Sequence, residues 1–239
     1  MPLGAVTLDA AGTLFEVAEP VGVTYARVAA RHGIGVTATE LDRAFRAALA
    51  GAPPLAFPGA SPVRLPDHER AWWYAVVRRT FGGAAASPGF DACFADLFDL
   101  YAEPAAWRVF PDAPGALREV RARGLRVGIV SNFDARLAGL LDGLDVAPLL
   151  DCVVHSTRAG AAKPDPAIFR AALDALGVAA ASAMHVGNDV VADVEGARAA
   201  GLQAVLLARD GHLPRLPAGV TCIRTLAELG STLDLRVHP

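Results

Sequence analysis

The sequence predicts an α/β protein in which helices cover a parallel β-sheet, and two patterns in the chain support this prediction. Across the C-terminal two-thirds, short apolar runs alternate with amphipathic helical segments. Strands that are apolar on both faces are typical of a buried parallel sheet. Because crossovers between parallel strands are right-handed, we expect a doubly wound, Rossmann-like core.

The expected strands are six apolar runs, at residues 3–8, 125–130, 152–155, 184–187, 204–207 and 220–223. The first run precedes the others by a long stretch of chain but fits the same sheet. Helical patterns lie between the later runs, at residues 113–123, 134–141, 166–176 and 190–200.

The stretch at residues 16–108 has a different pattern. It contains helical periodicity at residues 22–32, 39–49, 67–81 and 90–101, and no convincing strand. Loops rich in proline and glycine separate these helices, most clearly at residues 51–62. We therefore expect residues 1–15 and 109–239 to form the Rossmann-like core domain and residues 16–108 to form an inserted all-helical domain.

The amino-acid composition and net charge limit the classes of molecule that this protein is expected to bind. The 239 residues are 53% hydrophobic, and the formal net charge is −3, so nucleic acid and anionic membranes are not expected partners. No stretch approaches the roughly 20 apolar residues that span a bilayer, and the N-terminus lacks the basic segment of a signal peptide. Cys93, Cys152 and Cys222 are far apart in the chain, which favours free thiols in a reducing compartment. We expect a cytoplasmic protein.

Polar residues follow four of the expected strands. In open α/β sheets, ligands bind at the carboxyl ends of the strands. The residues in question are Asp9 after the first strand, Ser131 and Asn132 after the second, Lys163 after the third, and Asn188, Asp189 and Asp193 after the fourth. Carboxylates, a hydroxyl, an amide and an ammonium group should therefore converge on one edge of the sheet.

Several of these residues also have a purely structural interpretation. Ser131 or Asn132 could cap the helix that begins near residue 134. Asp189 and Asp193 are four residues apart and would share a helix face, as in any acidic first turn.

Two histidines, His155 and His185, fall within predicted strands. We interpret both as core residues and not as ligands, and we expect Trp72 and Trp73 to pack the core of the helical domain.

Lys163 is the only lysine among the 22 lysines and arginines of the chain. Lysine is a compact point charge on a flexible stem, whereas arginine is a larger planar fork. A surface position would tolerate either residue, so the single lysine indicates a specific role.

Taken together and in this order, DAAGTL, SNFD, KPDP and VGNDVVAD resemble the four motifs of the haloacid dehalogenase-like (HAD) superfamily of hydrolases. The resemblance covers nearly the whole chain, with the helical insertion as a cap between the first and second motifs. The residues of these motifs are most similar to those of a haloacid dehalogenase-like hydrolase subgroup whose members are mostly phosphatases or of uncharacterised activity.

The resemblance implies a phosphatase acting on a small phosphorylated molecule. Asp9 would attack phosphorus and form an aspartyl-phosphate, Ser131 would hydrogen-bond the transferring group, and Lys163 would neutralise charge between nucleophile and substrate. Gly12, Thr13 and Asn132 would contact the substrate.

The resemblance also implies Mg²⁺ beside Asp9. The candidate ligands are Asp9, the backbone carbonyl of Ala11, Asn188, Asp189 and Asp193. The relatives have an aspartate where this chain has Asn188; we prefer Asn188 at the metal position with Asp193 in the outer shell, and the alternative pairs Asp189 with Asp193. Two carboxylates ~4 Å apart repel by roughly 4 kcal/mol at an effective dielectric of 20, which a divalent cation and Lys163 would offset.

Ala11 is the second departure from the family pattern. Phosphatases of the family have an aspartate there that protonates the leaving group, and such catalysis contributes about 10²–10⁴-fold. We therefore expect substrates with good leaving groups.

Two alternatives stay open. One is a metal-independent 2-haloacid dehalogenase, although that group has a tyrosine where this chain has Ala11. The other is a catalytically weak binding or regulatory protein, which Ala11 and Asn188 together favour. A phosphonoacetaldehyde hydrolase would need a lysine in the cap, and residues 16–108 contain none.

Overall fold

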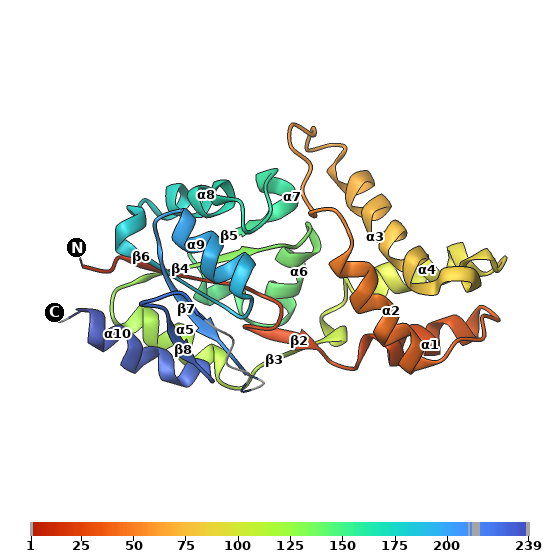
Figure 1. Cartoon of the computed structure of the whole chain (residues 1–239), viewed down its shortest axis with the longest axis horizontal. Coiled ribbons are helices and arrows are strands. Elements are labelled where there is room, and N and C mark those ends of the chain that lie inside the picture. The colour runs from red at the N-terminus through yellow and green to blue at the C-terminus, as the bar shows by residue number, and fades with distance from the viewer. Residues whose placement is uncertain (1, 210, 212–215, 238–239) are drawn as a thin grey trace. The chain divides into compact units, whose positions relative to one another are not determined.

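The computed structural model describes residues 2–209, 211 and 216–237, with side chains to residue 234 in the last segment (Figure 1). The chain divides into two compact units. One comprises Met1–Glu16, Ala56–Gly59 and Val109–Pro239, and the other comprises Val17–Leu55 and Ala60–Arg108. Within the described part of the chain, no helix is long and apolar enough to cross a membrane.

The larger unit is built on a six-stranded sheet with the order β5-β4-β1-β6-β7-β8, in which every pair is parallel. Its strands are β1 (Ala5–Leu8), β4 (Arg126–Ser131), β5 (Cys152–His155), β6 (Ala183–Gly187), β7 (Gln203–Leu207) and β8 (Thr221–Ile223). The predicted α/β class and parallel sheet are confirmed. All four residues of β1 are buried, as expected for a central strand with both faces covered.

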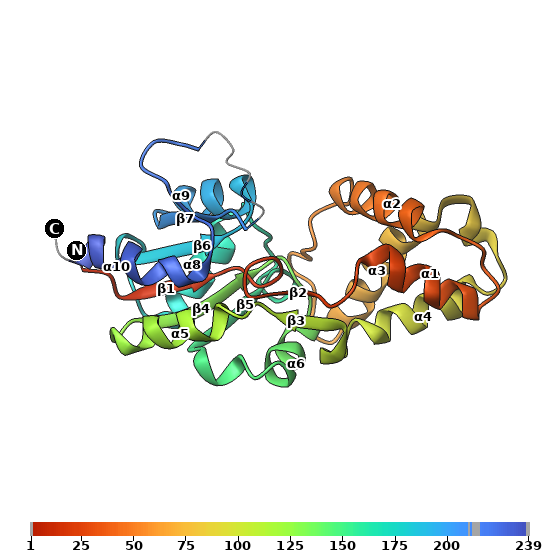
Figure 2. The same ribbon diagram turned by 90° about the horizontal axis from the view of Figure 1, so that it is seen from below.

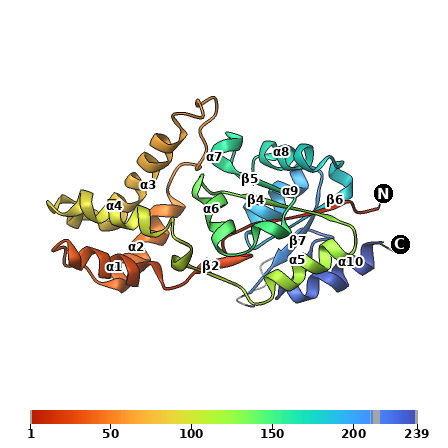
Figure 3. The ribbon, with the colours of Figure 1, turned by 180° about the vertical axis from the view of Figure 1, so that it is seen from behind.

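Helices cover both faces of this sheet. They are α5 (Ala113–Ala122), α6 (Arg136–Gly143), α7 (Ser156–Ala159), α8 (Pro166–Leu176), α9 (Gly196–Ala199) and α10 (Leu229–Val237). Figures 1 and 3 show α8 and α9 on one side of the sheet and α5 and α10 on the other. On the α8 side, Ile168 and Phe169 are fully buried in a cluster with Val130 of β4 and Leu206 of β7, so the first turn of α8 is anchored to the sheet.

The smaller unit is a four-helix cluster of α1 (Val21–Arg31), α2 (Ala38–Ala50), α3 (Leu65–Phe81) and α4 (Phe90–Leu100) (Figure 2). Its core is aromatic: the ring of Tyr25 stacks on that of Phe81 with centroids 6.0 Å apart. Trp73 packs against this core as expected, whereas Trp72 donates from Nε1 to the Pro53 carbonyl.

Two features differ from the expected domain organisation. A two-stranded ribbon of β2 (Phe15–Val17) and β3 (Trp107–Val109) overlaps the ends of the stretch in which no strand was expected. Strands of three residues are too short for a period-two pattern to be visible. In addition, Ala56–Gly59 belongs to the larger unit, where the backbone of Phe57 and Pro58 lies close to Gly160.

Asp112, just before α5, joins three loops of the larger unit. Its carboxylate accepts hydrogen bonds from the Arg209 guanidinium at 2.9 and 3.0 Å, the Thr225 hydroxyl at 2.5 Å and the Leu226 amide at 2.8 Å. Arg209 also donates to the Thr13 carbonyl at 2.8 Å. The loop after β7 is thereby tied to the turn that follows β1.

The acid stability of this junction follows from the pKa of Asp112. Burial raises that pKa, but the hydrogen bonds from Arg209, Thr225 and Leu226 outweigh burial and hold it below its ordinary value. A depressed pKa means that the ionised carboxylate stabilises the fold above the unfolded-state pKa of about 3.9, and that this stabilisation is lost as pH falls through the folded-state value.

We predict that Asp112→Asn lowers the free energy of unfolding at pH 7 by about 1.5–3 kcal/mol, the range for hydrogen bonds to charged groups. Urea unfolding should show the difference from wild type shrinking as the pH falls below about 4 and vanishing below the folded-state pKa of Asp112, where both proteins lack the charge. Asp174→Asn, at an exposed position of α8, is the control and should have little effect. A difference that is constant with pH would contradict this account.

Candidate active site

Asp9 lies at the carboxyl end of the central strand β1. Its backbone amide donates to the Val186 carbonyl of β6 at 2.9 Å, and the residue is 9% exposed. The chain then turns sharply, with the amides of Thr13 and Leu14 donating to the Ala10 carbonyl. Gly12 is required in this turn because its φ is +84° and because a Cβ there would lie 2.8 Å from Nδ2 of Asn188. The turn thus presents the Asp9 carboxylate at the edge of the sheet.

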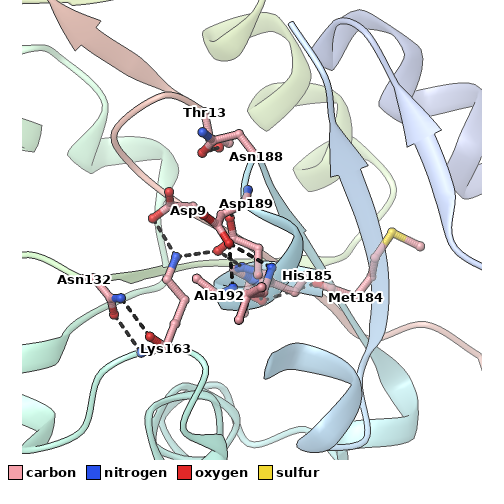
Figure 4. Close-up of polar contacts among 12 residues, drawn as sticks. Asp9, Thr13, Asn132, Lys163, Met184, His185, Asn188, Asp189 and Ala192 are labelled. Carbon is pink, nitrogen blue, oxygen red and sulfur yellow. Dashed lines mark hydrogen bonds and ion pairs between the residues drawn. The ribbon is translucent and has the colours of Figure 1, made fainter. Parts of the chain in front are cut away.

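The Lys163 ammonium is held between two carboxylates. Its Nζ lies 2.7 Å from Oδ1 of Asp9 and 2.6 Å from Oδ1 of Asp193, and its side chain is only 2% exposed (Figure 4). The backbone of Lys163 is fixed as well, because its amide donates to Oδ1 of Asn132 at 2.7 Å and its carbonyl accepts from Nδ2 of Asn132 at 2.9 Å. The amide of Asn132 therefore positions the lysine, while its expected contact with a substrate stays a prediction.

Asp193 is a buried carboxylate whose two oxygens both accept hydrogen bonds. Oδ1 faces Lys163 and also His185, whose Nε2 is 3.2 Å away. Oδ2 accepts from the Asp189 backbone amide at 2.9 Å. A Cβ on Gly187 would overlap the Asp193 carboxylate, so only glycine leaves room for it at that position.

Burial and pairing affect the three charged groups differently. Burial raises the pKa of Asp9 above its ordinary value, and Lys163 offsets this effect only in part. For Asp193, burial also acts to raise the pKa, but Lys163 and His185 outweigh it and lower the pKa. Burial acts to lower the pKa of Lys163, and the two carboxylates reverse this and raise it. Asp193 thus carries the better stabilised charge, and Asp9 is the more basic carboxylate.

The remaining predicted residues lie around this trio. Ser131 is the last residue of β4 and is buried. The Thr13 hydroxyl donates to Oδ1 of Asn188 at 3.3 Å. Asp189 caps the π-helical turn Val190–Glu195, with its Oδ1 accepting from two backbone amides at 2.8 and 2.7 Å.

Asp189 is thus the N-cap of this turn and not a residue within the helix, so it does not share a helix face with Asp193 as the structural interpretation required; its role toward a metal stays a prediction. The capping alternative for Ser131 and Asn132 is wrong. Helix α6 begins at Arg136 with Ala135 at its N-cap, and the side chain of Asp134 binds Arg136. Neither Ser131 nor Asn132 is used as a cap.

A divalent metal site has to be built from oxygen donors beside Asp9. Across residues 2–209, 211 and 216–237, no group of three or more His, Cys, Asp or Glu is placed to hold a metal ion. Both oxygens of Asp193 already accept hydrogen bonds, from Lys163 and from the Asp189 amide, so its place in the outer shell of a metal stays a prediction. The Asp9 carboxylate, the Ala11 carbonyl and the Asn188 amide oxygen fit Mg²⁺, which keeps several waters and needs one or two carboxylates from the protein.

His185 is the residue that sequence reasoning missed. It was expected to be an ordinary core histidine, and it is fully buried in β6, but both of its ring nitrogens face polar groups. The available signal was the residue type itself, because a buried polar side chain in an apolar strand requires hydrogen-bond partners.

Comparison with known proteins agrees with the motifs. Residues 3–201 match the family model described as haloacid dehalogenase-like hydrolase. The chain is 36% identical to haloacid dehalogenase-like hydrolase domain-containing protein 3 of Danio rerio, over 98% of both chains. It is 41% identical to a protein of Mycobacterium tuberculosis that is named a phosphatase, over 52% of this chain and 56% of that protein.

Among solved structures, a dehalogenase is 26% identical to the chain, with a TM-score of 0.69 and 96% of each chain covered. The family model spans more than half of the chain, and the fold places the motif residues at the edge of one parallel sheet. The chain belongs to the haloacid dehalogenase-like hydrolases.

Proposed function

We propose that this hydrolase is a Mg²⁺-dependent phosphatase that forms an aspartyl-phosphate on Asp9 and acts on small phosphorylated metabolites with good leaving groups. The observation that carries the proposal is the pairing of Asp9 with the buried Lys163 ammonium at 2.7 Å. A basic carboxylate beside a fixed cation suits attack on an anionic phosphoryl group, since the cation offsets repulsion between the two anions. The similarity to the M. tuberculosis phosphatase also supports a phosphatase activity.

The residues of the chain divide the reaction between them. An oxygen of Asp9 forms a bond to phosphorus while the bond to the leaving oxygen breaks and its electron pair departs with the leaving group. Lys163 holds the phosphoryl oxygens and orients the carboxylate, and Ser131 at the end of β4 hydrogen-bonds the transferring group. Water then cleaves the aspartyl-phosphate, which releases phosphate and restores Asp9.

A bound Mg²⁺ would supply further neutralisation of the charge on Asp9 and the phosphoryl oxygens. Asp9, the Ala11 carbonyl and Asn188 would hold it, with Asp193 in the outer shell. This set contains a single directly available carboxylate, so we expect weaker metal binding than a site with two.

Ala11 sets the substrate range. A methyl group cannot protonate a departing oxygen, so the leaving group must depart as an anion. Acyl and aryl phosphates satisfy this condition because their leaving groups are weakly basic, whereas sugar phosphates expel an alkoxide.

We predict that kcat/KM for acetyl phosphate and 4-nitrophenyl phosphate exceeds that for alkyl phosphates by about 10²–10⁴-fold, the usual contribution of general acid catalysis. Rates across a series of aryl phosphates should fall steeply as the pKa of the leaving group rises. Ala11→Asp should narrow the gap by accelerating alkyl esters. Equal rates on aryl and alkyl esters in the wild type would mean that another residue supplies the proton.

Asp9→Asn should abolish turnover of every phosphate substrate while the protein stays folded by circular dichroism. The amide is a poor nucleophile and cannot pair with Lys163 as an anion. Asp174→Asn, with its side chain exposed on α8, should keep wild-type rates. Undiminished hydrolysis by the Asp9 variant would rule out this nucleophile.

Lys163→Arg and Lys163→Ala should both lose most activity. The guanidinium is larger and planar, so it does not fit the space that a buried ammonium fills between Asp9 and Asp193. Calorimetry should show weaker binding of inorganic phosphate, with the larger loss in the alanine variant. Arg170→Ala, an exposed cation of α8, is the matched control. An active Lys163→Arg enzyme would show that any cation suffices.

A metal-independent 2-haloacid dehalogenase is the second candidate, favoured by the similarity to a solved dehalogenase and by the absence of an acid at Ala11. A panel of phosphate esters and 2-haloacids, each with Mg²⁺ and with a chelator, separates the two. Turnover of phosphates that needs Mg²⁺ is expected. Turnover confined to 2-haloacids would establish the dehalogenase, and phosphate binding without any turnover would establish a binding protein.

A further inference from the structure

A buried polar chain reaches the site from inside the sheet. Thr7 of β1 and His185 of β6 are partners in the strand register, and Nδ1 of His185 lies 2.9 Å from the Thr7 hydroxyl. On the other side of the ring, Nε2 lies 3.2 Å from Oδ1 of Asp193. The Phe169 ring meets the imidazole edge-to-face at 5.0 Å. The imidazole therefore has contacts on three sides and is fully buried.

Proton counting assigns the tautomer of this ring. Nε2 of His185 lies 3.2 Å from a carboxylate oxygen of Asp193, so a hydrogen bond there requires a proton on one of the two atoms. Burial lowers the pKa of His185, which agrees with a neutral ring that carries one N–H. An ionised carboxylate can only accept a hydrogen bond, which places that proton on Nε2, facing Asp193. The Thr7 hydroxyl has one proton, and it lies 2.9 Å from Nδ1 and 3.3 Å from the Met184 carbonyl, to which it can also donate. In this tautomer Nδ1 is bare and takes that proton over the shorter contact. The opposite tautomer would set the lone pair of Nε2 against the Asp193 oxygen.

The same Asp193 oxygen also holds the catalytic cation. Oδ1 accepts from His185 and from Lys163, and Lys163 is in turn shared with Asp9. The hydrogen bond from His185 occupies part of the accepting capacity of Oδ1. It therefore weakens the attraction between Asp193 and the Lys163 ammonium. Loss of the Nε2 proton donor would shift the hydrogen bonding of Oδ1 onto Lys163 and move the ammonium away from Asp9. The Lys163 side chain is 2% exposed, so bulk water has little access to compensate.

We propose that His185 is a positioning residue: the hydrogen bond from its Nε2 to Asp193, with the tautomer set by Thr7, keeps the Lys163 ammonium on Asp9. The catalytic consequence rests on the proposed phosphatase function. The placement of the ammonium is a separate claim, and it can be tested without any turnover.

The single lysine of the chain makes the ammonium directly observable. Protein labelled with ¹⁵N at lysine Nζ, expressed without a lysine-containing tag, should give one side-chain ammonium resonance, that of Lys163. His185→Leu fills the space of the ring without a donor, and His185→Gln returns an N–H donor near the position of Nε2. The Lys163 resonance should shift in His185→Leu and return toward its wild-type position in His185→Gln. Met184→Leu, a volume-conserving change at the neighbouring buried position, is the control for packing of β6.

The tautomer is tested in the same protein. Long-range ¹⁵N–¹H spectra of histidine-labelled wild type, with the His185 signals identified by their loss in His185→Gln, should show a protonated Nε2 and a bare Nδ1. A protonated Nδ1 with a bare Nε2 would overturn the proposal.

The kinetic consequence is a loss of kcat for 4-nitrophenyl phosphate in His185→Leu of roughly ten- to a hundredfold, the range for a hydrogen bond to a charged group. His185→Gln should recover most of this loss, and inorganic phosphate should bind more weakly only in the leucine variant. An unmoved Lys163 resonance in His185→Leu, or equal effects of leucine and glutamine, would overturn the positioning role. If wild type hydrolyses no phosphate while the resonances behave as expected, the proposed function fails and the role of His185 stands.

Discussion

One buried ammonium group between two carboxylates is the interaction on which this site depends. Lys163 lies within 2.7 Å of both Asp9 and Asp193, at a point where its side chain is almost wholly removed from water. A lone carboxylate in that position would be strongly destabilised, and two would repel each other. The cation stabilises the pair of carboxylates. Burial raises the pKa of Asp9, which Lys163 offsets only in part, so Asp9 is the more basic of the two. The local sequence follows from this arrangement: glycine at 187 makes room for Asp193, and Asn132 fixes the backbone of Lys163.

The sheet supplies these groups from separate strands. Asp9 follows β1, Lys163 lies beyond β5, and Asp193 follows β6, so the trio forms only when the parallel strands are in register. The Asp112–Arg209 junction ties the loop after β7 to the turn after Asp9. The side chains that hold these loops together therefore also contact the turn that follows Asp9. Ala11 and Asn188 are uncharged, so neither adds to the negative charge that Lys163 offsets beside Asp9.

The local pattern of apolar residues was enough to predict the α/β class. Helix α8 lies at the predicted residues 166–176, because a proline marks the start of its apolar periodicity and a glycine follows its last residue. The lysine was identified as special from composition alone. The strands β2 and β3 could not be predicted from the sequence, because an alternating pattern over three residues cannot be distinguished from a loop. The role of His185 was also hidden: Thr7 is 178 residues away, and their pairing depends on the strand register. Asn132 was expected to contact a substrate, and its two hydrogen bonds to Lys163 depend on the approach of two loops that no spacing in the sequence encodes.

The central claim is that Asp9, held beside the Lys163 ammonium that offsets its repulsion of an anionic phosphoryl group, becomes covalently phosphorylated. The most direct measurement is acid quenching of the enzyme during turnover of acetyl phosphate, followed by peptide mass spectrometry. The account predicts a phosphoryl adduct on the peptide that contains Asp9, and its absence from the Asp9→Asn protein. Turnover that proceeds in water enriched in ¹⁸O with label entering the Asp9 carboxylate, and with no phosphoryl adduct at any quench time, would contradict it.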